Sequence, residues 1–265
     1  PVTNGFVLIP AGSFWMGSPE TELGRTAARE TLHYVQLTKS FYMGKYEITQ
    51  GQFNAVMGYN PSYFSSCGDD CPVENVSWYE ALAYANALSI EHGVEECFDC
   101  TGDAPDFECT LKTKFAKPQD CLGYRLPTES EWEYAARSGT DTAFYNGDIT
   151  ETGCEMDANL DAIGWYCGNS DNKTHPVGGK LANAFGLYDM SGNVWEWTMD
   201  WYGTYPTGTE AAPDVDPTGP ESGSRRVVRG GSWGSDAQSC RSARRSYGPP
   251  SRRGSYLGFR LTRTK

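Results

Sequence analysis

The sequence predicts a loop-rich α+β domain with few helices. Its 265 residues include 30 glycines and 15 prolines, which favour turns, and 16 tyrosines and eight tryptophans, which supply core area in short elements. Few segments show the long helical spacing of apolar residues, which argues against a helical bundle. A chain of this length can bury a sizeable core. We therefore expect a single domain over residues 1–265.

The first part of the chain predicts strands followed by a helix. Residues 5–18 contain two short apolar runs broken by Pro10, Ala11 and Gly12, which is typical of a hairpin-like pair of strands. Residues 34–37 and 41–48 return to strand-like alternation. Thr49 can then cap a helix that ends near Met57.

Two further helices begin with capping boxes, Ser77–Glu80 and Thr128–Glu131, in which a hydroxyl and a carboxylate satisfy the first free amides. Apolar spacing carries the first helix to about His92 and the second to about Arg137. A short strand and turn precede the second helix, and residues 140–184 are expected to be loops.

The cysteines predict disulfides and an oxidising compartment. Eight of the nine precede residue 170 and lie in polar loops, while Cys240 is left over. Their pairing stays open; bonds between neighbours are the simplest choice, namely 67 with 71, 154 with 167, and two bonds among 97, 100, 109 and 121. Residues 94–123 are then a disulfide-held insertion. Alternatively, Cys97 and Cys100 form half of a zinc knuckle or a redox pair, although no histidine clusters with them.

The cysteines also bear on where the protein works. The chain begins at Pro1, without Met, so a leader would lie outside this sequence. We expect an exported protein, periplasmic or at the bacterial surface. No window approaches 18 apolar residues, so no transmembrane segment is predicted.

Positive charge is concentrated at the end of the chain. Residues 225–265 hold eleven of the 22 lysines and arginines and one acid, Asp236, although the whole chain has a net charge of −12. We expect these arginines to pair mainly with carboxylates and aromatic rings of the rest of the domain. The net negative charge argues against nucleic acid as a partner.

The segment 229–261 is the predicted ligand-display segment. It begins with Gly230-Gly-Ser-Trp233 and ends with the apolar Leu257, Phe259 and Leu261, but the residues between are mostly small, polar or charged. Such a composition cannot be mostly core, and both ends look anchored.

Several segments together resemble the formylglycine-generating enzyme (sulfatase-modifying factor) family. They are residues 123–137 (GYRLPTESEWEYAAR), 186–197 (GLYDMSGNVWEW), 229–233 (RGGSW) and 257–261 (LGFRL), with residues 7–17 and 46–51 fitting the family's start. The resemblance runs nearly end to end. It implies a variant of the C-type lectin fold: a small twisted antiparallel sheet, a few helices, and irregular backbone held by aromatic residues and calcium.

The resemblance also implies what the chemistry can be. The family includes copper-dependent oxidases that use two cysteines five residues apart after the Gly-Gly-Ser-aromatic turn. Cys240 falls at the second position, but Ser235 stands at the first. Because copper(I) prefers two soft thiolates, Ser235 argues against copper and against catalysis. If the protein is an enzyme, Cys240 is its catalytic candidate.

Other members of this fold family are variable proteins of diversity-generating retroelements, which display a diversified patch near the C-terminus. Residues reachable from altered Asn codons are frequent over residues 233–256, and Tyr and Arg there suit a binding surface. The ligand-binding candidates are Trp233, Gly234, Ser235, Asp236, Ser239, Arg245, Ser246, Tyr247, Ser251, Arg253, Ser255 and Tyr256. The alternative is that some arginines, Arg241 and Arg244 first, are buried pairing residues.

Calcium is the cofactor that the resemblance implies. Asp189 and Glu196, with the carbonyls of Gly192 and Val194, match one family site, and hard oxygen donors on a tight turn suit this ion. The alternative is that Asp189 and Glu196 cap amides or pair with arginines. A second structural site would use Asn159, the Leu160 carbonyl and Asn169.

The sequence thus predicts a non-catalytic, calcium-stabilised protein that binds a protein or other macromolecule through residues 233–256, with a variable protein as one form of this hypothesis. A monomer is favoured. Cys240 is expected to be an unpaired thiol in the binding patch, with a remnant metal ligand or a disulfide partner as alternatives. The alternative function is a copper- and oxygen-dependent oxidase, or a related protein-modifying enzyme, that uses Cys240.

Overall fold

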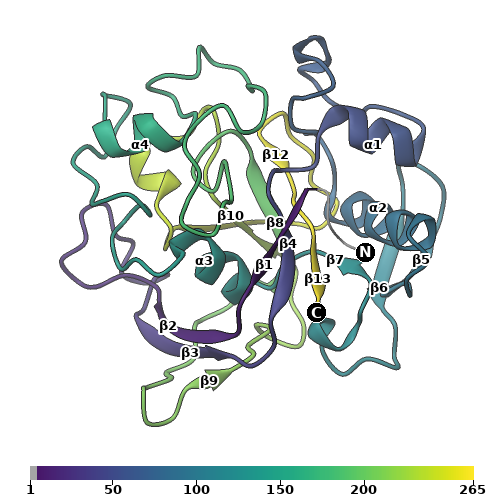
Figure 1. Ribbon diagram of the computed structural model, residues 1–265, viewed down its shortest axis with the longest axis horizontal. Helices are drawn as coiled ribbons and strands as arrows, with labels where there is room; N and C mark the ends of the chain where they lie inside the picture. The colour runs from purple at the N-terminus through teal and green to yellow at the C-terminus, as the bar shows by residue number, and fades with distance from the viewer. Residues whose placement is uncertain (1–4) are drawn as a thin grey trace.

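The computed structural model describes residues 5–265 and confirms the α+β class (Figure 1). In this range the helices are α1 (Gln50–Met57), α2 (Trp78–Glu91), α3 (Glu129–Arg137) and α4 (Ala158–Ile163). The strands are β1 (Phe6–Ile9), β2 (Gly12–Met16), β3 (His33–Leu37), β4 (Phe41–Gly44), β5 (Phe98–Thr101), β6 (Glu108–Leu111), β7 (Tyr124–Arg125), β8 (Trp195–Trp201), β9 (Asp214–Val215), β10 (Arg226–Arg229), β11 (Arg245–Gly248), β12 (Leu257–Gly258) and β13 (Thr262–Thr264).

The strands are divided among small sheets instead of forming one. Their orders are β1-β4-β13-β7, β11-β10-β8-β12, β2-β3-β9 and β5-β6. The pairs β8–β12 and β3–β9 are parallel, and the other pairs are antiparallel. Figure 1 shows α1 and α2 on one side of the molecule and α4 on the other, with α3 and β8 between them.

The predicted hairpin over residues 5–18 is wrong in its pairing, although both strands exist. Strand β1 pairs with β4, and β2 pairs with β3. Pro10 and Ala11, the two residues between the strands, do not reverse the chain but carry it from one sheet into the next.

The predicted capping boxes are confirmed. At the start of α2 the Ser77 amide donates to Glu80 Oε2 (2.7 Å) and the Glu80 amide donates to Ser77 Oγ (3.2 Å). Reciprocal bonds of the same kind begin α1 at Thr49 and α3 at Thr128. Helix α4 falls in a stretch predicted to be loop. Its six residues are too few to show helical spacing.

The four disulfides follow the neighbour pairing: Cys67–Cys71, Cys97–Cys121, Cys100–Cys109 and Cys154–Cys167. Because Cys97 and Cys100 are each bonded to another cysteine, the zinc and redox alternatives for this pair are wrong. The Cys100–Cys109 bond joins β5 to β6 inside the insertion. No helix within residues 5–265 is long and apolar enough to cross a membrane.

The sheet β11-β10-β8-β12, hereafter the C-terminal sheet, separates two groups of core side chains. On β8, Trp197 and Met199 pack in the group that surrounds α2. Glu196, the residue before Trp197, points the other way, because side chains alternate along a strand. It accepts a hydrogen bond from the Trp132 indole of α3, whose ring belongs to the second group (2.8 Å). We call these two sides of the sheet the α2 face and the α3 face.

Candidate functional site

Ion pairs hold the C-terminal sheet against α3. On β11, Arg245 donates from Nε to Glu129 Oε1 (2.8 Å) and from Nη2 to Oε2 (2.6 Å). On β10, Arg229 pairs with Glu133. The fork-to-carboxylate geometry at Glu129 is the strong form of this interaction. The α3 face is therefore closed by charges that satisfy one another.

Other arginines of the C-terminal segment are used in the same way. Arg260 holds both oxygens of Glu196 at 2.7 Å, and Arg241 binds Glu30 at 2.9 and 3.0 Å. The expectation that the basic end pairs within the domain is confirmed. The assignment of Arg245 to the ligand surface is wrong, because its side chain is 2% exposed and bonded to Glu129.

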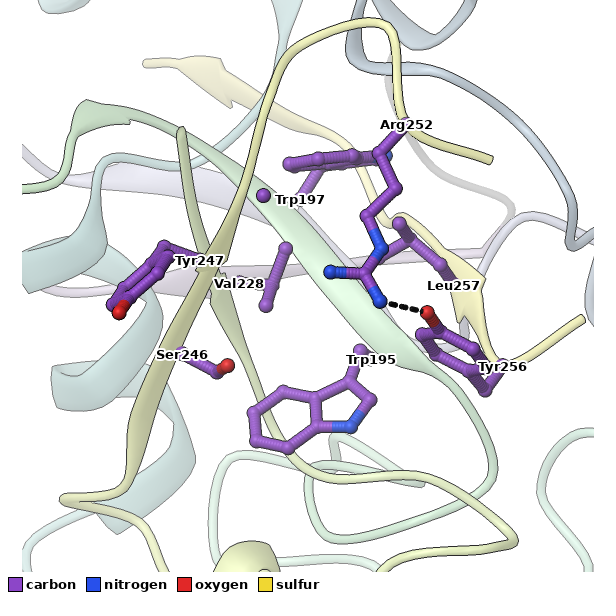
Figure 2. A pocket seen from close by; sticks show the side chains of 9 residues that line it. Trp195, Trp197, Val228, Ser246, Tyr247, Arg252, Tyr256 and Leu257 are labelled. Carbon is purple, nitrogen blue, oxygen red and sulfur yellow. Dashed lines mark hydrogen bonds between the residues drawn. The ribbon is translucent and has the colours of Figure 1, made fainter. Parts of the chain in front are cut away.

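The α2 face carries an open cavity of about 190 Å³ where it reaches the surface (Figure 2). We call this cavity the tryptophan–arginine pocket. Its lining residues are Trp195, Trp197, Val228, Ser246, Tyr247, Gly248, Arg252, Tyr256 and Leu257. Strands β8, β10 and β11 form its floor, and the loop before β12 brings in Arg252 and Tyr256.

The side chains of the pocket converge from opposite sides. Figure 2 shows the Arg252 guanidinium reaching from the loop towards Tyr256, with the Trp195 ring below it. Arg252 Nη2 donates to the Tyr256 hydroxyl. No ion pair within residues 5–265 includes Arg252. Its charge therefore faces solvent and the pocket.

Three of the lining residues are among the candidates predicted from the sequence, but Trp195 and Arg252 are not. Ser246, Tyr247 and Tyr256 were candidates. Trp195 was missed because it lies in a motif that the resemblance assigns to the framework. Its position two residues before the buried Trp197 was the available signal, since it places both side chains on one face. Arg252 belongs to the group of arginines that suits a binding surface, but it was not singled out as a candidate, because nothing in the sequence distinguishes it from the paired arginines.

The other candidates lie outside the pocket lining. Trp233 and Ser255 contact each other, because the Trp233 indole donates to the Ser255 carbonyl (2.9 Å). Gly234 and Ser251 are exposed. Arg253 pairs with Glu80 (2.9 Å).

Asp236 and Ser239 belong to a short 3-10 turn, Ala237–Cys240. Asp236 Oδ1 accepts the Ser239 amide (3.1 Å) and its Oδ2 accepts the Gln238 side chain (2.8 Å). The Asp236 carboxylate thus caps this turn and is satisfied locally.

Cys240 is free but buried, so its expected place in the binding patch is wrong. Burial and nearby Asp236 raise the pKa of its thiol well above the usual range. Gly231 packs directly on it: a Cβ at Gly231 would lie 2.5 Å from the Cys240 sulfur. Ser235, at the first cysteine position, accepts the Ser232 amide through its hydroxyl (3.0 Å). A buried, protonated thiol is a poor nucleophile and metal ligand.

The residues of the first calcium turn fit the ion in part. Asp189 is buried with φ +57°; its Oδ2 accepts the Gly178 amide (2.7 Å), and its Oδ1 has no hydrogen-bond partner. Burial raises the pKa of Asp189 to about 6. Both Glu196 oxygens are already bound by Arg260. Within residues 5–265 no three acidic, His or Cys side chains form a metal-binding group. Of the predicted ligands, Asp189 and the carbonyls of Gly192 and Val194 are thus better placed to bind calcium than Glu196.

The second calcium set has no such free oxygen. The Leu160 carbonyl accepts the Gly164 amide (2.9 Å). The Asn169 carbonyl oxygen accepts the Tyr166 amide (2.9 Å), and its amide donates to Asp161. Asn159 donates to the Asp148 carbonyl (2.8 Å). None of these three residues has a buried side-chain oxygen without a partner like that of Asp189, so the second set fits calcium less well than the first.

Fold and site together define a disulfide-bonded α+β domain of the C-type lectin type with an open pocket near its C-terminus. The chain belongs to the sulfatase-modifying factor family, because the sulfatase-modifying factor enzyme 1-like domain matches residues 2–265.

Two relatives that match this chain are named as different kinds of protein. The chaperone protein LppX of Paenibacillus barcinonensis is 35% identical over 73% of this chain and 69% of its own. The formylglycine-generating enzyme of Thermomonospora curvata is 28% identical over 98% of this chain and 93% of its own. Sequence identity at this level establishes the family and leaves the activity open.

Two solved structures are similar over nearly the whole chain. Treponema denticola variable protein 1 is 35% identical with a TM-score of 0.80, covering 98% of this chain and 95% of its own. PvdO from Pseudomonas aeruginosa is 29% identical with a TM-score of 0.74, covering 98% and 94%. These likenesses confirm the predicted variant of the C-type lectin fold.

Proposed function

We propose that this protein is a non-catalytic binding protein that takes its ligand at the tryptophan–arginine pocket and the surrounding residues of 233–256. The observation that carries this proposal is the pocket itself, in which an indole, a phenol and an unpaired guanidinium converge at the surface. Aromatic and arginine side chains in a surface pocket are typical of binding hot spots. The likeness to a protein named as variable adds support.

The same proposal includes calcium, export and diversification. Asp189, with its free buried oxygen, and the carbonyls of Gly192 and Val194 would hold a calcium ion that stabilises the turn before β8. Four disulfides fit an exported or surface protein. A reverse transcriptase gene beside this one, with an adenine-rich near-copy of its 3′ end, would establish a retroelement variable protein, and lack of both would reject that part.

Selection from a phage-displayed random-peptide library tests the binding role. We expect enriched phage to bind the wild type and to lose binding to Trp195→Ala, which removes a wall, and to Ser246→Phe, which fills the cavity. Leu181→Ala is the control, since Leu181 is an exposed apolar residue outside the lining. Enriched phage that bind both pocket variants as well as the wild type would contradict the proposal.

Copper(I) titration of the reduced protein tests the alternative oxidase function. We expect no sub-micromolar binding, because Ser235 is a poor copper(I) ligand and Cys240 is buried in a protonated state. Tight binding that disappears in Cys240→Ala would favour the copper enzyme.

A further inference from the structure

The lining of the tryptophan–arginine pocket offers side-chain hydrogen-bond donors and no carboxylate or amide. Arg252 supplies a guanidinium, Trp195 an indole N–H and Ser246 a hydroxyl, and no lining residue is Asp, Glu, Asn or Gln. A neutral sugar needs side-chain acceptors for its own hydroxyl groups and would find few here. The lining therefore favours a group rich in acceptor oxygens.

Because Arg252 is positively charged, the pocket favours an acceptor group that carries negative charge. Within residues 5–265 its side chain makes one hydrogen bond, to the Tyr256 hydroxyl, although a guanidinium carries five N–H donors. The adjacent Arg253 is instead neutralised by Glu80. A guanidinium with free donors binds a carboxylate through two parallel hydrogen bonds.

More positive charge lies at the edge of the sheet next to the pocket. Strand β11 is the edge strand, and Figure 2 shows the Ser246 hydroxyl inside the pocket and the Tyr247 ring turned away from it. The guanidinium carbons of Arg225 and Arg29 lie 4.8 and 5.3 Å from the centre of the Tyr247 ring. Neither arginine takes part in an ion pair within residues 5–265. A chain leaving the pocket across β11 would meet both.

The size of the pocket indicates part of a larger ligand. Its volume of about 190 Å³ lies below the range of roughly 300–1,000 Å³ typical of small-molecule sites. Trp195, Val228 and Leu257 give it apolar walls. It therefore suits one inserted side chain of a macromolecule that continues over the surface.

We infer that the pocket binds an acidic peptide segment of a partner protein, with one aromatic or long apolar side chain against Trp195 and a neighbouring carboxylate on Arg252. The inference rests on the proposed function and adds the chemistry of the ligand. A short acidic segment is favoured over a nucleic acid, because the net charge of −12 repels an extended polyanion.

Matched peptides test this inference. Peptides from the phage selection are synthesised in two forms, one as selected and one with each Glu or Asp changed to its amide, and their affinities are measured by fluorescence polarisation. We expect the amide form to bind at least about tenfold more weakly, since a charge-assisted pair is lost. Arg252→Gln weakens the acidic form by a similar factor and leaves the amide form unchanged.

The control is Lys114→Gln, which removes one exposed positive charge from the insertion, away from the pocket lining. It should leave both affinities unchanged. Arg252 is exposed, so folding of Arg252→Gln is checked by its circular dichroism. Pocket-dependent peptides whose two forms bind equally would overturn the inference and leave the proposed function standing. If no peptide depends on the pocket, both fail.

Discussion

The two faces of the C-terminal sheet use the same residue type in opposite ways. On the α3 face, Arg245 is 2% exposed and bound by both oxygens of Glu129. On the α2 face, seven residues later, Arg252 is exposed, with no carboxylate partner within residues 5–265. The partner of an arginine, and not its place in a basic stretch, therefore decides whether it holds the fold or stays free at the surface.

The largest expected effect separates these two arginines by stability. Arg245→Gln removes the bidentate partner of the buried Glu129 and leaves it only the longer ion pair with Arg229 (3.6 Å), so we expect the free energy of unfolding to fall by about 3 kcal/mol. Arg252→Gln should change it by less than about 0.5 kcal/mol, because the side chain is exposed. Guanidinium denaturation followed by tryptophan fluorescence measures both. Equal losses of stability in the two variants would show that Arg252 supports the fold as much as Arg245 does.

Calcium should have the next largest effect, and it acts on the turn that leads into β8. Adding calcium to EDTA-treated protein at about 100 times its dissociation constant should stabilise the fold by about 2.7 kcal/mol at pH 7.5. The gain should shrink at pH 5, because the pKa of Asp189 is raised to about 6 and a protonated carboxyl binds calcium poorly.

Two variants make the calcium test specific. Asp189→Asn should remove the gain in thermal stability, and Asp161→Asn, which changes the hydrogen-bond partner of Asn169 in the second predicted set, should keep it. A full gain in Asp189→Asn would place calcium elsewhere.

A third effect, smaller within any one pH unit, concerns pH and the α3 face. Burial, with help from Glu129, raises the pKa of Asp200 to about 8. The folded state therefore holds a proton that the unfolded state releases near pH 4, so this contribution to stability is present at low pH and is lost as pH rises towards 8. We expect the free energy of unfolding to fall by about 1 kcal/mol per pH unit between pH 5 and 8 from this group.

Asp200→Asn isolates that contribution. The amide can still accept the Glu129 amide hydrogen, which the Asp200 carboxyl accepts at 2.7 Å, but it does not titrate. Glu74, with a pKa raised to about 7, affects both proteins alike, so the difference between the two pH curves reports Asp200. If the unfolding free energies of the wild type and of Asp200→Asn changed with pH in the same way, Asp200 would be ionised in the folded protein.

Local signals in the sequence predicted the parts of the fold that depend on near neighbours. Thr49 as a cap located α1, and the capping boxes located α2 and α3, because both partners of each box lie within one turn. The disulfides joined cysteines at most 24 residues apart. The hairpin at residues 5–18 failed, since the partners of β1 and β2 come from β4 and β3.

The site was predictable only in outline, because it too depends on residues that lie far apart in the sequence. The charge contrast between the C-terminal segment and the rest of the chain predicted that arginines would pair internally. Which arginine pairs depends on strand alternation and on the distant helix α3, so Arg245 was listed as a ligand-binding candidate and Arg252 was not. The burial of Cys240 likewise depends on packing against Gly231, which composition does not reveal.

NMR titration of ¹⁵N-labelled protein with the selected acidic peptide tests directly whether the ligand binds at the tryptophan–arginine pocket. The indole N–H of Trp195, assigned with Trp195→Phe, and the Arg252 Nε–H should shift as peptide is added. The indole of Trp132 and the Nε–H of Arg245, which lie on the α3 face and are bonded to Glu196 and Glu129, should not. Shifts confined to the α3-face signals, or a peptide that binds without moving Trp195 and Arg252, would contradict the account.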